Sequence, residues 1–299
     1  MSTIRFRKLT KRYGPIVAID DLSFDVRPGK VTGFLGPNGS GKTTTLRVLL
    51  GLAAPSSGTA TIDGLAYRQL PDPVHRVGAA LDSSTFHPGR SAAQHLRVVA
   101  TATGLPSRRV DEVLGLVGLS DSAGRAVGGF SLGMRQRLSL AGALLGDPEV
   151  LIFDEPLNGL DPDGIRWIRG LLRSLAGENR TVFVSSHLLT EVAQTVDDVV
   201  VLSRGRLVAE TTLSELVERT SVVRVRTTDA PRLLDVLAAA GVQVRLIDGS
   251  TVEGRHASAE VIGLAAAEAG LPILELSRQD ADLESLFFDL VHQNQEIAA

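Results

Sequence analysis

The chain of 299 residues contains no cysteine, so it can form neither disulfide bonds nor thiolate metal sites. Aromatic residues make up only 4% of the sequence, and the formal net charge is −3. A charge so close to neutral argues against non-specific nucleic-acid binding as the main task, and we expect no nucleic-acid partner. The lack of cysteine suits a reducing compartment, so we expect a cytoplasmic location.

No uncharged apolar run is long enough to span a bilayer. The best candidate, Leu138–Phe153, is short and is interrupted by Asp147, Pro148 and Glu149. Residues 1–14 lack the apolar core of a signal peptide. The sequence therefore predicts a chain without membrane spans, so that any membrane role must be carried by a partner.

The most informative segment that is present is GPNGSGKTT, which fits the pattern G-x-x-x-x-G-K-[ST] of the P-loop. An apolar run, 31–35, precedes this segment and a helical pattern follows it. The glycines let the loop turn its N–H groups inward, and the following helix directs its positive dipole end to the same point. A purely structural glycine-rich turn is the weaker interpretation. The predicted phosphate-binding residues are Gly36, Asn38, Gly39, Ser40, Gly41, Lys42, Thr43 and Thr44.

Two acids, Asp154 and Glu155, follow directly after the apolar run Val150–Phe153. Such a run is typical of a strand buried on both faces of a parallel sheet, and carboxylates at its end face the ligand crevice. Asp154 and the hydroxyl of Thr43 are the candidate Mg²⁺ ligands, and Glu155 can deprotonate an attacking water. Lys42 supplies a cation for the β- and γ-phosphates.

The remaining patterns predict an α/β core with two additions. Short strands in residues 1–30 indicate an antiparallel β subdomain, and helical periods over about 85–145 indicate an inserted helical subdomain. From 150 to 202, apolar strands alternate with helices at Ile165–Leu175 and Leu188–Val196, as in a doubly wound sheet.

The character of the sequence changes near residue 215, so we expect domains at 1–215 and 216–299. The second is predicted to be a small α+β domain. Its expected elements are a strand at Val222–Arg226, a helix at Leu233–Ala240, a hairpin around Asp248-Gly249, a helix at Ala259–Glu268, a strand at Ile273–Leu276 and a helix at Leu283–Val291.

Six segments together resemble the nucleotide-binding subunit of an ABC transporter, and this resemblance covers about residues 1–215. Their order and spacing are highly specific to the family. The segments are Leu9–Gly14 as the A-loop, Gly36–Thr44 as Walker A, Phe130–Met134 as the signature, Val150–Glu155 as Walker B, Leu157–Asp161 as the D-loop and Val184–His187 as the H-switch. The resemblance implies a P-loop NTPase of the ABC ATPase type, with ATP and Mg²⁺ as cofactors.

Further site residues follow from the resemblance alone. Tyr13 would stack on adenine, and His187 would reach the γ-phosphate and help to place the attacking water. Ser131 and Gly133 would bind the γ-phosphate of ATP held by the other subunit. Asp161 would link the two sites across the dimer.

Two segments depart from the family pattern. Asp82 stands where the Q-loop normally has a glutamine; a carboxylate can still bind Mg²⁺ or its water, but it cannot donate a hydrogen bond when ionised. In the signature, Leu132 and Met134 replace glycine and glutamine. Similar Ser-x-Gly-Met variants occur among drug- and peptide-resistance exporters, which favours export over import.

The expected function is that of an ATP-hydrolysing subunit acting on a separately encoded integral membrane permease. It would work as a homodimer or with a paired cassette subunit, peripheral on the inner face of the cell membrane. The region Phe86–Gly89 is a candidate docking surface, and 216–299 would be regulatory or, less well supported, a ligand sensor.

The alternative function is that of a soluble ABC ATPase acting on ribosomes or DNA, although the chain lacks the second cassette, coiled-coil insertion or basic face that such proteins favour. A small-molecule kinase or GTPase would leave the signature and His187 unexplained. A non-hydrolytic binding module would be expected to lack Glu155.

Overall fold

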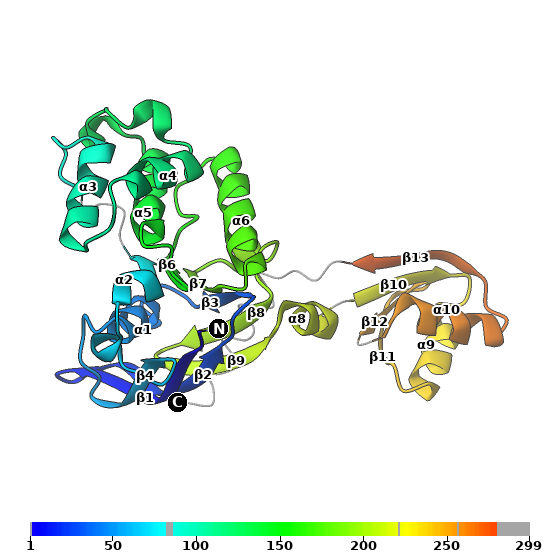
Figure 1. The fold of residues 1–299 in the computed structure, drawn as a ribbon. Helices are drawn as coiled ribbons and strands as arrows, with labels where there is room; N and C mark the ends of the chain where they lie inside the picture. Colours follow the sequence, from blue (N-terminus) through cyan, green and yellow to red (C-terminus); the bar gives the residue numbers. More distant parts are fainter. Residues whose placement is uncertain (1, 82–85, 221, 256, 280–299) are drawn as a thin grey trace. The chain divides into compact units, whose positions relative to one another are not determined.

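The computed structural model describes residues 2–81, 86–220, 222–255 and 257–279. These residues form two compact units, which divide between Glu210 and Thr211. Among the described residues, the larger unit contains two sheets and several helices, and the smaller unit contains one sheet and three helices (Figure 1). Within the described parts of the chain, every helix is too short or too polar to cross a bilayer.

A six-stranded sheet with the order β5-β6-β7-β3-β8-β9 forms the centre of the larger unit. Neighbouring strands from β5 to β8 are parallel. A tight turn with positive φ at Arg204 (48°) and Gly205 (80°) joins β8 to β9, as a two-residue hairpin requires. The strand bounds are Val77–Ala80 (β5), Val150–Asp154 (β6), Thr181–Ser186 (β7), Val31–Leu35 (β3), Asp198–Ser203 (β8) and Arg206–Thr212 (β9).

An antiparallel sheet with the order β2-β1-β4 packs against this central sheet through four phenylalanines. The ring centroid of Phe183 on β7 lies 6.3 Å from that of Phe6, 6.0 Å from that of Phe24 and 5.2 Å from that of Phe34. All four side chains are buried, so the rings form the core between the two sheets. The strand bounds are Ile4–Tyr13 (β1), Ile16–Val26 (β2) and Ser57–Ile62 (β4).

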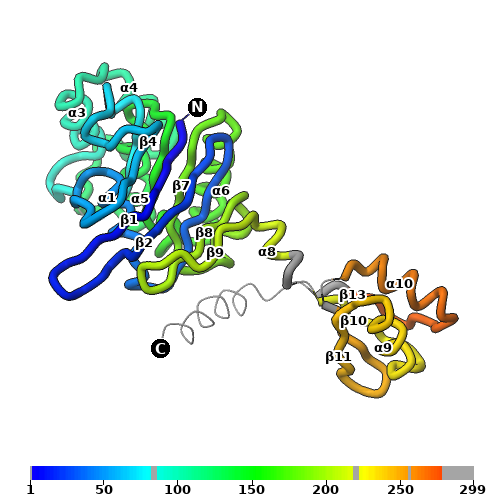
Figure 2. Tube along the Cα trace, turned by 90° about the horizontal axis from the view of Figure 1, so that it is seen from below, coloured from blue at the N-terminus to red at the C-terminus, as the bar shows by residue number. Residues whose placement is uncertain are grey.

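Polar contacts in the middle of β2 also hold the two sheets together. Figure 2 shows β2 beside β8 and β9, where the backbone N–H of Asp20 donates to the carbonyl of Gly205 at 2.8 Å. The side chain of Asp20 also pairs with Arg206 at 2.7 Å. The antiparallel β subdomain predicted from residues 1–30 is therefore present, and β2 joins it to the central sheet through Phe24 and Asp20.

Three helices form the helical subdomain that the sequence predicted (Figure 1). The first begins at Ser91, whose side chain accepts from the N–H of Gln94 at 3.2 Å while the Gln94 side chain accepts from the N–H of Ser91. Arg109 donates to the carbonyls of Leu144 and Leu145, both at 3.1 Å, where its charge complements the helix dipole. The helices are α3 (Ala92–Ala102), α4 (Arg108–Leu116) and α5 (Leu132–Leu144), with 3₁₀ turns at Ser120–Ser122 (η2) and Val127–Gly129 (η3).

The other helices of this unit lie near the ends of the central strands. The predicted helix at Ile165–Leu175 is present as α6. The prediction for Leu188–Val196 was too long, because only Leu189–Val192 is helical; the chain then turns so that Val196 packs against Gly33. The bounds are Lys42–Leu49 (α1), Tyr67–Gln69 (η1), Pro73–Arg76 (α2), Pro162–Gly177 (α6), Leu189–Val192 (α7) and, where the second unit begins, Leu213–Thr220 (α8).

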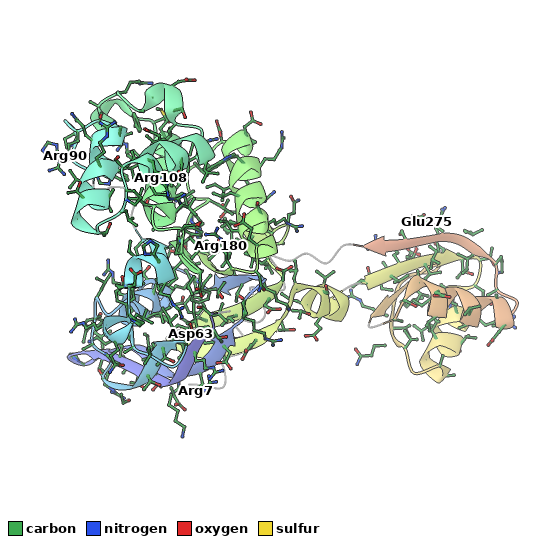
Figure 3. All side chains as sticks on the ribbon, in the orientation of Figure 1. Arg7, Asp63, Arg90, Arg108, Arg180 and Glu275 are labelled. Carbon is green, nitrogen blue, oxygen red and sulfur yellow. The ribbon has the colours of Figure 1, made fainter. Side chains whose placement is uncertain are left out.

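Arg180 fixes the two loops that lead into β6 and β7 (Figure 3). Its guanidinium donates to the carbonyl of Pro148 at 3.0 Å and pairs with Asp147 at 2.8 Å and Glu178 at 2.7 Å. Burial lowers the pKa of Arg180, but the two carboxylates raise it by more, so the pKa lies above its ordinary value. The cation therefore remains charged and holds the starts of both strands.

The smaller unit is an antiparallel sheet with the order β11-β12-β10-β13 and two helices on one face. Its β-α-β-β-α-β sequence of elements is the ferredoxin-like pattern. The predicted strands, hairpin and first two helices of this region are all present, whereas the predicted helix Leu283–Val291 lies outside the described residues. The bounds are Val222–Thr227 (β10), Ala230–Ala239 (α9), Gln243–Asp248 (β11), Thr251–Arg255 (β12), Ala259–Glu268 (α10) and Ile273–Gln279 (β13).

The phenylalanine core leads to a prediction about stability. Phe183→Ala should lower the free energy of unfolding by about 3–5 kcal/mol, because it would leave a cavity in the core between the two sheets. The matched control is Leu116→Ala, which truncates a side chain that is 56% exposed and should change stability by less than about 0.5 kcal/mol. Urea denaturation measures both changes, and equal losses would contradict the assigned core.

Candidate active site

The loop between β3 and α1 has the backbone that the P-loop pattern predicts. Gly39 and Gly41 have φ of 78° and 109°, which are left-handed values that favour glycine. A side chain at Gly36 would overlap the carbonyl of Leu202, so this position also requires glycine. The hydroxyl of Ser40 is buried and has no hydrogen-bond partner in the described part of the chain. The loop is therefore packed closely against the end of β8 at Gly36, and the hydroxyl of Ser40 remains unpaired.

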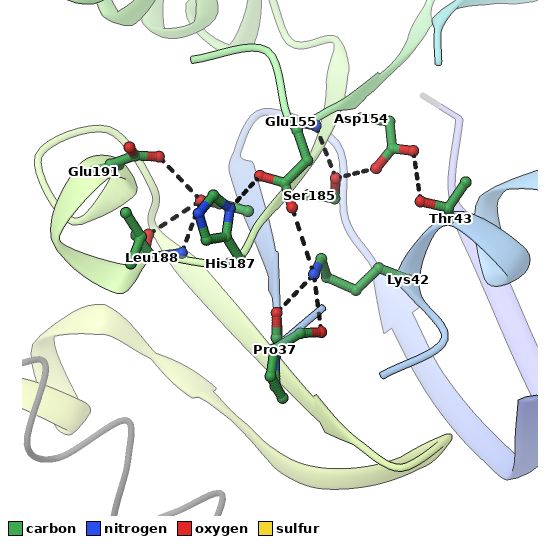
Figure 4. Close-up of polar contacts among 11 residues, drawn as sticks. Pro37, Lys42, Thr43, Asp154, Glu155, Ser185, His187, Leu188 and Glu191 are labelled. Carbon is green, nitrogen blue, oxygen red and sulfur yellow. Dashed lines mark hydrogen bonds and ion pairs between the residues drawn. The ribbon is translucent and has the colours of Figure 1, made fainter. Parts of the chain in front are cut away.

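Lys42 is almost fully buried in this loop. Its Nζ donates to the carbonyls of Gly36 at 2.6 Å and Pro37 at 3.3 Å, and it lies 3.4 Å from a carboxylate oxygen of Glu155 (Figure 4). A buried ammonium needs such partners, since desolvation of an unpaired charge is costly. The P-loop cation and the acid after β6 are thus in direct contact.

The two candidate Mg²⁺ ligands from α1 and β6 also lie together. The hydroxyl of Thr43 donates to Asp154 Oδ2 at 2.8 Å, and the other oxygen of Asp154 accepts from the hydroxyl of Ser185. A hydroxyl and a carboxylate are oxygen donors of the kind that Mg²⁺ prefers. The donor set therefore fits the metal, although the third predicted ligand, Asp82, lies outside the described residues.

Ser185 was not predicted from the sequence. It lies opposite Asp154 in the register of β6 and β7, and its Oγ also accepts from the N–H of Glu155 at 2.9 Å. This bond holds the backbone of Glu155 at φ 50°, a value that residues with a side chain rarely adopt. Two serines at the end of an apolar run, Ser185 and Ser186, were the only sequence signal for this contact. The register of β6 and β7 is needed to show that Ser185 faces Asp154.

His187 and Glu155 form a hydrogen-bonded pair. Nδ1 of His187 lies 2.9 Å from Oε2 of Glu155, while Oε1 of the same carboxylate faces Lys42 (Figure 4). Glu155 is thus held between a cation and an imidazole, with its side chain 23% exposed. A carboxylate held in one orientation beside a phosphate cradle has the geometry of a general base.

Other predicted residues lie outside this cluster. Ser131 and Asp161 are exposed caps at the first turns of α5 and α6, where their side chains accept from Met134 and Gly164 N–H groups. The ring of Tyr13 at the end of β1 is 47% exposed, with the Lys11 ammonium 4.6 Å from its centroid.

Leu132, one of the unusual signature residues, contacts the D-loop of the same chain. A side chain at Gly159 would overlap Leu132, and Gly159 has a φ of 70°. Gly133 likewise faces Leu160, whose methyl group would lie 3.3 Å from an added Cβ. The signature and D-loop segments are therefore packed together, and Leu132 and Gly159 line a cavity that Glu155 also lines.

The P-loop follows β3 and precedes a helix, and the Walker B acids lie at the end of β6, which is separated from β3 by β7. This arrangement in a parallel sheet defines a P-loop nucleoside triphosphatase. Residues 19–158 match the family described as ABC transporter, and residues 221–284 match a domain of unknown function, DUF8746.

Known proteins identify the family further. The chain is 44% identical over 223 residues to the bacitracin transport ATP-binding protein BcrA of Bacillus licheniformis, covering 73% of each chain. It is 33% identical over 207 residues to the lantibiotic transport ATP-binding protein SrtF of Streptococcus pyogenes, covering 69% of this chain and 90% of that protein. A solved ATP-binding subunit of an ABC transporter matches with a TM-score of 0.64 and 27% identity, covering 71% of this chain and 91% of that one.

The chain therefore belongs to the ABC transporter family of ATP-binding proteins. It is the ATP-binding and ATP-hydrolysing subunit of an ABC transporter, as the sequence predicted, rather than an ABC ATPase acting on ribosomes or DNA.

The burial of Lys42 predicts the effect of its removal. Lys42→Ala should weaken nucleotide binding at least about tenfold, because a charge-assisted contact to phosphate is lost. Lys30→Ala is the matched control, since Lys30 pairs with Asp198 at 2.8 Å on another part of the sheet. Titration calorimetry with a non-hydrolysable ATP analogue measures both affinities; normal binding by Lys42→Ala would rule out the assigned cradle.

Proposed function

We propose that two cassettes, either two copies of this chain or this chain and a paired subunit, close around two MgATP. In each site the P-loop and Lys42 hold the phosphates, and Thr43 and Asp154, together with Asp82, hold Mg²⁺. The hydrogen-bonded position of Glu155 between Lys42 and His187 is the observation that carries this proposal.

Glu155 accepts the proton of the attacking water in this proposal. His187 contacts the carboxylate at 2.9 Å and keeps it oriented, so that little rearrangement is needed when water arrives. The helix dipole of α1 and the ammonium of Lys42 stabilise negative charge on the phosphates. Mg²⁺, when bound, would neutralise further charge on the phosphate oxygens.

Closure across the dimer explains the residues that lie outside the cluster. Ser131 and Gly133 begin a 13-residue helix, α5, whose N-terminus suits a phosphate held by the opposite cassette. Asp161 would connect the two sites, and the exposed ring of Tyr13 would stack on adenine. The γ-phosphate then acts as part of the interface, so hydrolysis releases it.

The proposed membrane partner is an integral permease that docks beside the helical subdomain. A cavity of about 480 Å³ there is lined by apolar groups and His95, and it includes Phe86 from the predicted docking region. Burial lowers the pKa of His95, and nearby Arg90 lowers it further, so the imidazole is neutral at neutral pH. An apolar segment of the permease would fit this groove and hold the chain at the inner face of the membrane.

The proposed substrates are peptide antibiotics, which the transporter would export from the cell. The relatives are named for bacitracin transport and lantibiotic transport, and both compounds in those names are peptide antibiotics. The Ser-Leu-Gly-Met form of the signature agrees with an exporter of this kind.

Glu155→Gln tests the assigned base and the dimer together. The amide keeps the contacts of the carboxylate but cannot accept a proton, so ATP turnover should fall by about 10²–10⁴-fold. With MgATP the variant should elute as a dimer in size-exclusion chromatography, and cells carrying it should lose resistance to the transported peptide.

Glu112→Gln is the matched control, because Glu112 pairs with Arg109 in the helical subdomain, at 2.5 Å. It should retain wild-type turnover and oligomeric state. A monomeric Glu155→Gln variant with full turnover would eliminate the proposed base, and unchanged peptide resistance would eliminate the substrate class.

For residues 216–299 we propose a regulatory or dimer-stabilising role. The unit described from Thr211 has a core of its own, made by β10, β12 and the helices α9 and α10. A shortened chain that ends at Thr220 should fold, because the larger unit also has its own core. We expect it to bind ATP normally but to show weaker dimerisation or altered coupling of ATPase to transport; no change in either would contradict this role.

A further inference from the structure

Gln136 is a buried polar side chain of the larger unit that the proposed mechanism leaves without a role. It lies on α5, one turn after Ser131 and Leu132, and is 6% exposed. Its amide has no hydrogen bond to any residue in the described part of the chain. The amide atoms of Gln136 are not sealed from solvent, so water in the adjoining cavity can pair with them.

The side chain of Gln136 lines a cavity of about 370 Å³ that also contains the catalytic acids. Leu132, Gln136 and Ser139 contribute one wall, and their spacing of four and three residues places them on one face of α5. Asp154 and Glu155 line the same cavity. The cavity is large enough for several water molecules, and both α5 and the segment after β6 contribute polar groups to it.

The carboxylate oxygens in this cavity have acceptor capacity left. Asp154 accepts from Thr43 and Ser185, and Glu155 contacts Lys42 and His187. Each carboxylate has about four lone-pair positions, so both acids can accept further hydrogen bonds. The amide of Gln136 supplies the N–H donor that such acceptors need.

The sequence around this cavity explains why the amide of Gln136 is of interest. Leu81, at the end of β5, lines the same cavity, and the next residue is Asp82, where the family has a glutamine. An ionised aspartate has no hydrogen to donate, whereas Gln136 has two. The amide of Gln136 on α5 is therefore a donor at a cavity that the end of β5 also lines.

We propose that Gln136 is a positioning residue for ATP hydrolysis, whose side-chain N–H groups orient water against Asp154 and Glu155. The inference rests on the proposed roles of those two acids. Because α5 is one continuous helix, Gln136 lies about 7–8 Å along its axis from Ser131. In the proposed dimer, Ser131 contacts the ATP held by the opposite cassette, whereas Gln136 faces the acids of its own chain. Phosphate contact at Ser131 would therefore set the position of the Gln136 amide at the chain's own ATP site.

Gln136→Met tests the donor, because it keeps the length and packing of the side chain but removes the amide. The full-length chain should show a kcat for ATP hydrolysis lowered about tenfold, with KM for ATP within about twofold of wild type. Its thermal unfolding midpoint should stay within about 2 °C, as expected for a fold that is unchanged. Gln69→Met, at an exposed position on η1, is the matched control and should retain wild-type kcat.

Gln136→Glu supplies a second measurement that does not depend on how Met packs. The glutamate side chain has the same shape as glutamine. When ionised it can accept hydrogen bonds but cannot donate them, so kcat should fall here as well. Full kcat in either folded variant would overturn the proposal, as would a rise in KM with kcat unchanged. Glu155→Gln measured in parallel separates the two levels: if it is inactive while both Gln136 variants are fully active, only the positioning role fails.

Discussion

The parallel alignment of β3, β7 and β6 is the constraint on which the site depends. It brings the carboxyl ends of three strands to one edge of the sheet, and the functional side chains follow those ends. Ser185 lies opposite Asp154 because of this register, and the same alignment lets His187 reach Glu155. A shift of one residue between β6 and β7 would turn these side chains to opposite faces.

Burial then decides how the charges of the site behave. The side chain of Lys42 is only 5% exposed, and its ammonium is stabilised by two loop carbonyls and by the carboxylate of Glu155. The chain thus maintains a linked set of polar contacts from the P-loop to β6 and β7. Ser131 of the signature makes no hydrogen bond to this set; its side chain caps α5, which accords with a role toward a second cassette.

The sequence predicted the class of fold well, because the relevant signals are local. The P-loop, the apolar run Val150–Phe153 and the helical periods of 85–145 each lie in one continuous segment. Predictions were weaker where packing decides the outcome: the helix expected at Leu188–Val196 ends after Val192, since Val196 packs against Gly33. Nothing in the local pattern of 188–196 indicates that contact.

The sequence by itself determined the family and supplied the candidate phosphate-binding residues, because motif spacing records the chemistry of the loop. Tertiary structure alone decided which polar groups meet. Neither Ser185, inside the H-switch segment, nor Gln136 was predicted to be a site residue, and their places became visible only when β7 paired with β6 and α5 packed beside the acids. The physical reason is that strand register and helix packing are long-range, so they join residues that no short segment of sequence contains together.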